Sequence, residues 1–345
     1  MLFRRTPSTV LAVALLASSA LADGREPGSV LFYPYQGSVL GDVEDEEGEG
    51  PPVNQLAVAF PVFNVASVTN TRRDGGGETD VHFQYVNVDA NTNPFLFANC
   101  SISDRVETLT PADMLSVLTS CHNGSFGASG YLMVSAMDPN QLDTYWSFNH
   151  LIGSEYVVTA GGGMFGLNAL PFASPLPEGT NTDLDADGRR DFDGAEYEPI
   201  PDELYLDSFF GVLPSYLVLA SLTGPEYLTN VDFVIFNDDE FQLSAQFAFA
   251  CWCEVLLADV SGYFTAEGLA TTPDDPAALD LDCNGVQDVD TGWAIVRPTI
   301  ALSITSPNIV NPAVLGASYT VAQALFGGRV LWESTAKQTN GQFPN

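Results

Sequence analysis

Two short stretches of the sequence carry acidic side chains at spacings that suit a metal ion. Residues 183–194 read DLDADGRRDFDG, and residues 280–292 read DLDCNGVQDVDTG. Each stretch has a glycine at its sixth position and oxygen-bearing side chains at the first, third, fifth, ninth and eleventh. These are Asp183, Asp185, Asp187, Asp191 and Asp193 in the first stretch, and Asp280, Asp282, Asn284, Asp288 and Asp290 in the second. Hard cations such as Ca²⁺ take about six to eight oxygen ligands on a loop that wraps around them. The spacing therefore predicts two sites for Ca²⁺.

Both stretches resemble the D-x-D-x-D-G calcium loops of EF-hand, dockerin and thrombospondin type 3 modules. The resemblance is confined to these loops and implies nothing for the rest of the chain. It departs from the EF-hand at position 12, where Gly194 and Thr291 replace a bidentate glutamate; Asp193, Asp290 or Glu196 could substitute for it. Without that ligand, the resemblance implies a dissociation constant on the order of 0.1 to 1 mM. The alternative is a solvated acidic segment, which is also how we interpret residues 42–52 (DVEDEEGEGPP).

The first 22 residues have the form of a secretory signal peptide. Arg4 and Arg5 precede an apolar run, and Ala20-Leu21-Ala22 forms a small-x-small cleavage site before Asp23. The run is too short to span a bilayer as a helix. We therefore expect an exported protein, in the periplasm, outside the cell or at the cell surface, with no membrane insertion.

The charge of the chain narrows the range of partners. With 11 basic and 44 acidic residues, the formal net charge is −33. Nucleic acids and anionic membranes bind basic patches, so both are unsuitable partners. An unknown extracellular protein or a glycan is the expected partner.

The remaining sequence predicts an all-β protein made of two tandem antiparallel β-sandwich domains. Short runs rich in Val, Phe, Tyr and Thr alternate with turn residues, and amphipathic helices are missing. Residues 79–89 and 229–239 share the pattern T-x-V-x-F-x-x-x-N-x-D, and similar gaps then separate three further pairs of landmarks. These pairs are Cys100 with Cys251, Gly130 with Gly292, and Tyr156 with Tyr319. We interpret the pattern as an internal duplication.

The duplication sets the expected domain boundaries. A signal peptide (1–22) precedes one sandwich (23–173), an acidic calcium-loop linker (174–203) and a second sandwich (204–345) with a calcium-loop insertion at 274–291. Without calcium, we expect the linker to open locally and to expose Arg189-Arg190 to trypsin, which would release two stable halves.

Five cysteines in an exported chain predict disulfides. The repeat favours one bridge from Cys100 to Cys121 and another from Cys283 to Cys251 or Cys253, since alternate residues of a strand share a face.

No catalytic constellation stands out, so we expect a non-enzymatic binding or structural protein. His82, His122 and His150 lack the spacing of a zinc site. The first alternative is a carbohydrate-binding module or hydrolase accessory, which an exposed planar row of aromatic residues would support and buried tryptophans would weaken. The second is a hydrolase that uses His150.

Overall fold

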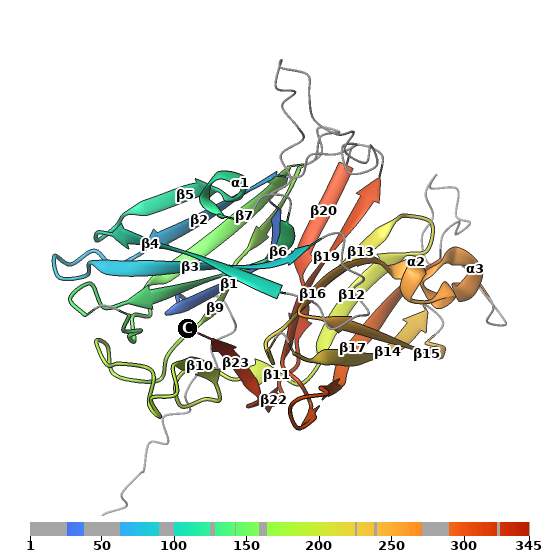
Figure 1. The fold of residues 1–345 in the computed structure, drawn as a ribbon. Helices are drawn as coiled ribbons and strands as arrows, with labels where there is room; N and C mark the ends of the chain where they lie inside the picture. The colour runs from blue at the N-terminus through green and yellow to red at the C-terminus, as the bar shows by residue number, and fades with distance from the viewer. Residues whose placement is uncertain are drawn as a thin grey trace, which may run out of the picture.

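The described residues of the computed structural model form two lobes, each built from two antiparallel sheets (Figure 1). The structure describes residues 26–37, 63–89, 100–124, 128–141, 143–158, 164–224, 226–237, 240–270, 290–322 and 325–344. The expected signal peptide, the acidic stretch at 42–52 and most of the second aspartate stretch lie outside these residues.

The first lobe contains strands β1 to β9. Its larger sheet has the order β4-β3-β6-β1-β9 and its smaller sheet the order β5-β2-β7-β8. The bounds are β1 Val30–Gly37, β2 Phe63–Asn70, β3 Thr79–Asp89, β4 Cys100–Leu109, β5 Met114–Leu118, β6 Ala128–Met137, β7 Leu151–Val158, β8 Met164–Asn168 and β9 Leu170–Phe172. A short helix, α1 (Thr119–His122), follows β5.

The second lobe contains strands β12 to β21. Its larger sheet has the order β15-β14-β17-β12-β21, with β18 beside β17, and its smaller sheet the order β16-β13-β19-β20. The bounds are β12 Leu204–Phe210, β13 Ser215–Ser221, β14 Leu228–Asn237, β15 Gln242–Ala250, β16 Trp252–Leu256, β17 Thr291–Leu302, β18 Ile309–Val310, β19 Val314–Ala322, β20 Leu325–Val330 and β21 Trp332–Glu333. Short helical turns follow β16, namely α2 (Leu257–Val260), η1 (Gly262–Phe264) and α3 (Ala266–Leu269).

The two lobes repeat one strand order, and they also repeat its register. Asn87 pairs with Gly130 in the first lobe, and Asn237 pairs with Gly292 in the second. A Cβ atom on either glycine would overlap a carbonyl oxygen of the neighbouring strand, which explains why both positions hold glycine. The predicted all-β class with antiparallel sheets is confirmed, whereas descent from a duplication stays a prediction.

Cys100 and Cys251, which we paired as equivalent positions of the repeat, do not occupy equivalent positions in the two lobes. Cys100 begins β4, which is an edge strand of the first lobe. Cys251 instead follows the last residue of the corresponding strand β15, at Ala250. The distance in sequence from Asn87 to Cys100 is close to that from Asn237 to Cys251 only because the β3–β4 connection is longer than the β14–β15 connection.

The sheets enclose three clusters of buried apolar side chains. One lies between the two sheets of the first lobe and another between the two sheets of the second. The third lies between the lobes, where Phe32 and Met133 of the larger first-lobe sheet join Val218 and Leu315 of the smaller second-lobe sheet. Two of the sheets are therefore buried on both faces, and the lobes share a core.

The connecting segment, residues 174–203, is part of this shared core. Its strands β10 (Arg189–Phe192) and β11 (Ile200–Pro201) pair with the C-terminal strands β23 (Gly341–Pro344) and β22 (Lys337–Gln338). Phe192 and Phe343 belong to the inter-lobe cluster. Figure 1 shows β10 and β23 beneath the first lobe, next to β9.

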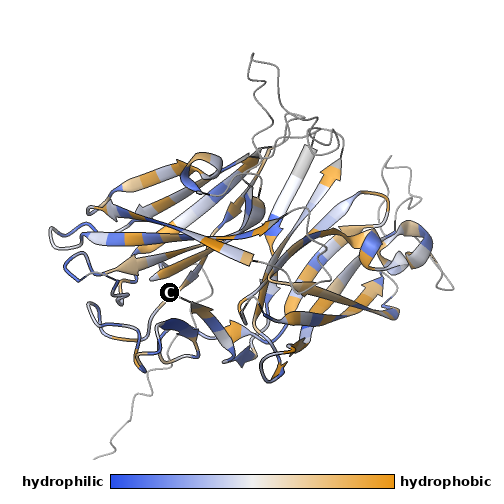
Figure 2. Cartoon of the chain, in the orientation of Figure 1, coloured by the Kyte–Doolittle hydropathy of each residue, from blue (hydrophilic) through white to orange (hydrophobic). Residues whose placement is uncertain are grey.

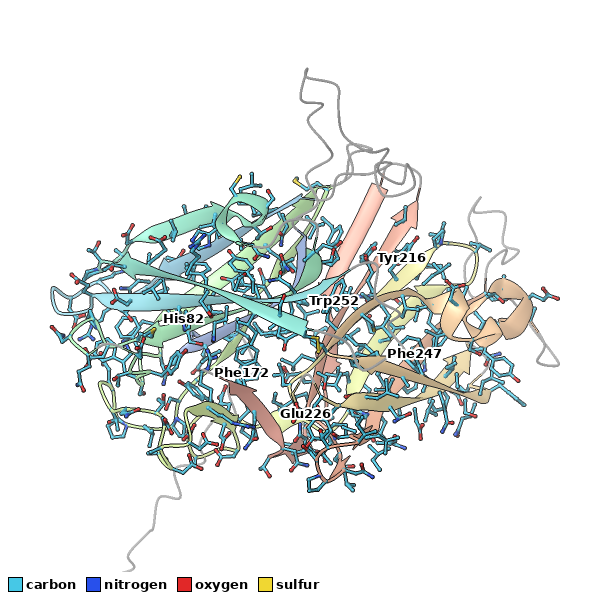
Figure 3. The ribbon with its side chains drawn as sticks, viewed as in Figure 1. His82, Phe172, Tyr216, Glu226, Phe247 and Trp252 are labelled. Atoms are coloured by element: carbon cyan, nitrogen blue, oxygen red, sulfur yellow. A yellow bond between two sulfur atoms is a disulfide. The ribbon has the colours of Figure 1, made fainter. Side chains whose placement is uncertain are left out.

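The predicted disulfide pairing is wrong. Cys100 is bonded to Cys251, across the two lobes, and Figure 3 shows this sulfur–sulfur bond between the lobes near Trp252. Cys121 and Cys253 are free, the first exposed and the second buried, and Cys283 lies outside the described residues. Cys251 has a φ of 55°, which breaks the strand alternation just before β16. It therefore joins the inter-lobe cluster, while Cys253 points into the second-lobe core.

Among the described residues, no helix has the length and apolar character needed to cross a membrane.

Candidate metal site

The first aspartate stretch brings three of its predicted ligands together. One carboxylate oxygen from each of Asp183, Asp185 and Asp187 lies within 4.8 Å of the others. Asp185 and Asp187 are exposed and Asp183 is half-buried. The loop lies directly before β10 and is mostly hydrophilic in Figure 2.

Hydrogen bonds to the backbone hold these carboxylates in place. Asp185 Oδ1 accepts from the backbone N–H of Asp187 at 3.1 Å, and Asp183 Oδ2 accepts from that of Gly188 at 3.2 Å. The φ of Gly188 is 75°, a left-handed conformation that glycine adopts without strain. The glycine at position 6 therefore lets the chain turn back so that its own N–H group reaches the first aspartate.

Glu196 closes the loop from its far side. This buried carboxylate accepts from the backbone N–H of Leu184 at 2.6 Å and from that of Asp191 at 3.0 Å. Burial raises the pKa of Glu196. Glu196 therefore links the start of the loop to β10. The sequence indicates this residue only as a substitute for the missing glutamate at position 12.

Asp191 and Asp193 lie outside the three-residue cluster. Burial, followed by the charges of Asp187, Asp185 and Asp193, raises the pKa of Asp191 to about 6. Within the described part of the chain, Oδ1 of Asp183 and Oδ1 of Asp191 are buried without a hydrogen-bond partner. Asp193 Oδ1 accepts from the backbone N–H groups of Ala195 and Glu196 at 2.7 and 3.1 Å. Asp193 thus stabilises the following turn.

Of the five predicted ligands in the second calcium loop, the structure describes Asp290 alone. Asp290 is buried, and its backbone carbonyl accepts from the N–H of Gly211 at 3.1 Å. The other predicted ligands, Asp280, Asp282, Asn284 and Asp288, lie outside the described residues.

Arg190 anchors the loop to the first lobe. Its side chain is fully buried and donates to Gln84 and Ser135, on strands β3 and β6. The guanidinium carbon lies 4.5 Å from the ring centre of Tyr145 and 4.6 Å from that of Phe343. Cleavage by trypsin without calcium stays a prediction, but the two halves are not independent. Arg190 is inaccessible, and the lobes share a core and a disulfide.

The three histidines lie apart in separate contacts. His82 Nδ1 bonds the hydroxyl of Tyr145 at 2.6 Å, and His122 Nδ1 bonds that of Tyr85 at 2.8 Å. His150 Nε2 lies 3.8 Å from a carboxylate oxygen of Glu178. Burial lowers the pKa of all three imidazoles. These contacts are those of packed side chains, and they give the hydrolase interpretation no support.

The four tryptophans divide between the interior and the surface. Trp252 is buried and Trp146 is half-buried. Trp293 and Trp332, on the larger second-lobe sheet, are 39% and 57% exposed. Packing in the core therefore explains the positions of Trp252 and Trp146 but not those of Trp293 and Trp332.

Comparisons with known proteins add no functional information. No protein-family model matches the chain, and no curated protein matches it. Among solved structures, the empty top component of cowpea mosaic virus is 9% identical, over 97% of this chain and 99% of that one, with a TM-score of 0.19. The CupB6 tip adhesin of Pseudomonas aeruginosa is 10% identical, over 88% and 98%, with a TM-score of 0.13. These TM-scores are too low to carry an argument.

Proposed function

We propose that the chain is an exported, calcium-stabilised protein of two tandem sandwiches that acts as a binding or structural component rather than as an enzyme. The observation that carries the proposal is the convergence of Asp183, Asp185 and Asp187 on one loop. A cation would neutralise carboxylates that otherwise repel one another, and would give the buried Oδ1 atoms of Asp183 and Asp191 a partner.

The position of the loop supports a stabilising role for the ion. The loop leads directly into β10, whose Arg190 and Phe192 are buried beneath the first lobe. Calcium on the loop would therefore hold in place a segment that contributes to the core between the lobes. The equal strand order and pairing of the two lobes support the tandem duplication.

Calcium titration followed by thermal unfolding tests the proposal. With a dissociation constant of about 0.1 to 1 mM, 10 mM Ca²⁺ adds roughly 1.4 to 2.7 kcal/mol to the free energy of unfolding. This raises the Tm of the wild type by a few degrees, whereas 10 mM Mg²⁺ should raise it less, because Mg²⁺ dehydrates reluctantly.

The Asp185→Asn variant should lose most of the calcium response. Asp259→Asn, an exposed aspartate of α2 in the second lobe, removes the same charge and serves as the matched control. It should respond as the wild type does. Equal responses of all three proteins would show that calcium binds elsewhere, and no response in the wild type would refute the proposal.

A further inference from the structure

The outward face of the larger second-lobe sheet carries a continuous group of apolar and aromatic side chains. Strand pairing aligns Val234 of β14 with Ile295 of β17, Ile295 with Tyr205 of β12, and Tyr205 with Trp332 of β21. Directly paired residues project from the same face of a sheet. The row therefore crosses the sheet from β14 to its edge.

A stacked pair of rings extends this row. Phe236 pairs with Trp293, and their ring centres lie 4.4 Å apart with the planes 12° from parallel. Trp293 and Trp332 lie on strands separated by β12, and Trp293 is two residues along β17 from the residue level with Trp332, so their positions are roughly 12 Å apart. Both indoles are exposed. We call this set the aromatic face: Tyr205, Val234, Phe236, Trp293, Ile295 and Trp332.

The two arginines beside the aromatic face are already paired. Arg297 Nε donates to Glu203 at 2.6 Å, and Arg329 forms an ion pair with Asp207 at 2.9 Å. Asp207 also accepts from the indole N–H of Trp332 at 3.3 Å. The surface therefore offers polar groups for hydrogen bonding without an uncompensated positive charge.

We propose that the aromatic face binds a neutral polysaccharide. A hexose ring presents an apolar C–H face that can lie against an indole, and hydroxyl groups at its rim that can bond carboxylates and guanidiniums. An acidic glycan or nucleic acid would meet paired arginines and a chain of net charge −33, and would be repelled. The separation of Trp293 and Trp332 is comparable to the length of two linked sugar rings.

This inference rests on the proposed function, because it names the partner of a protein that acts by binding. Its test is native affinity electrophoresis in gels that contain xyloglucan, galactomannan, laminarin or hydroxyethylcellulose, with hyaluronan as the acidic comparison. The wild type should be retarded by at least one neutral polymer and not by hyaluronan.

Variants of the aromatic face test whether the polysaccharide binds there. Trp293→Ala and Trp332→Ala should each weaken retardation about 10-fold, since stacking contributes roughly 1.4 kcal/mol. Tyr156→Ala, which removes an exposed ring from the smaller first-lobe sheet, should leave retardation unchanged.

Three results would overturn the inference: no retardation by any neutral polymer, retardation by hyaluronan alone, or full retardation of both tryptophan variants. If sedimentation instead shows a dimer that Trp332→Ala dissociates, without polysaccharide binding, the face joins two copies of the chain and the inference is wrong. Calcium-dependent Tm shifts in the same samples keep its failure separate from that of the proposed function.

Discussion

The larger sheets of the two lobes share one strand order, but the outward face is buried in the first lobe and accessible in the second. In the first lobe, Phe32, Tyr131 and Met133 are buried beneath the connecting segment and the second lobe. In the second lobe, the positions at the same register hold Tyr205, Trp293 and Ile295, which are half-buried or exposed. The same backbone pattern thus builds a shared core in one place and an accessible aromatic surface in the other.

The difference shows that the surroundings of a sheet decide what its outward face does. Apolar side chains on this face occur in both lobes, so the sequence of the strands alone does not separate a core from a binding surface. What covers the first-lobe face is a segment held by Arg190, by pairing with β23 and, in our proposal, by calcium. The aromatic face stays open and, in our proposal, binds a partner outside the chain.

The largest expected effect comes from the bond that locks the lobes together. Replacing Cys100 and Cys251 with serine removes a cross-link between residues 151 apart in sequence. The free energy of unfolding should fall by about 4 kcal/mol, because the unfolded chain gains the entropy of a long open loop. Urea denaturation measures it. The control is Cys121→Ser, at an exposed free thiol, which should change stability by less than about 0.5 kcal/mol. Equal stabilities of the two variants would contradict the cross-lobe bond.

The Arg190→Ala variant tests how firmly the connecting segment is held against the outward face of the larger first-lobe sheet. The change removes the bonds to Gln84 and Ser135 and both ring contacts, and it leaves a cavity under β10. We expect a loss of about 3 kcal/mol. Arg189→Ala, one residue earlier on the exposed side of β10, should cost about 0.5 kcal/mol or less. Calcium-saturated urea denaturation compares the two, and similar losses would show that Arg190 is not the anchor.

Matched truncations compare the two outward faces directly. Tyr131 and Trp293 each follow the glycine that pairs with an asparagine of the neighbouring strand. Tyr131→Ala should cost about 3 kcal/mol, because it empties a buried site, whereas Trp293→Ala should cost about 1 kcal/mol. Losses of equal size, measured by thermal unfolding, would remove the distinction between a covered and an open face.

The buried carboxyl group of Glu155 makes the stability of the first lobe depend on pH. Ser318 occupies the corresponding register position in the second lobe. Burial holds the pKa of Glu155 well above its usual range, so the folded state favours the protonated form. That contribution to stability is complete below the unfolded pKa of about 4.5 and is lost as the pH rises toward the folded value.

The Glu155→Gln variant should therefore gain stability relative to the wild type between pH 5 and pH 8. The gain is about 1.4 kcal/mol for each pH unit over which the two pKa values differ. Chemical denaturation at the two pH values measures it, and Glu78→Gln, at an exposed position, is the control. A difference that does not change with pH would mean that Glu155 is ionised in the folded protein.

Local sequence patterns predicted the elements of this fold well. The run rich in Val and Phe within residues 229–239 indicated a strand, and β14 lies there with alternate side chains buried. The spacing of Asp183, Asp185 and Asp187 likewise predicted that their carboxylates would converge, and the glycine at position 6 makes the required turn.

Features that depend on distant parts of the chain could not be read from such patterns. The wrong disulfide assignment followed from the repeat, which placed each bridge within one copy, whereas the bond joins Cys100 to Cys251 across the lobes. Cys251 and Cys253 also do not share a face as alternate residues of a strand would, because Cys251 has a positive φ. The burial of Arg190 depends on strands β3 and β6 and on Phe343, far away in the sequence. Nothing in the acidic composition of the connecting segment signalled that it pairs with the C-terminal strands.

Hydrogen–deuterium exchange with and without calcium tests most directly whether an ion holds the cover on the first-lobe face. At 10 mM Ca²⁺, amides of residues 183–194 and of the paired strand β23 should exchange about 10- to 100-fold more slowly than in EDTA. Amides of β14 and β17, under the open aromatic face, should exchange equally in both conditions. Unchanged exchange in residues 183–194 would contradict the account and identify the loop as an acidic turn without a metal.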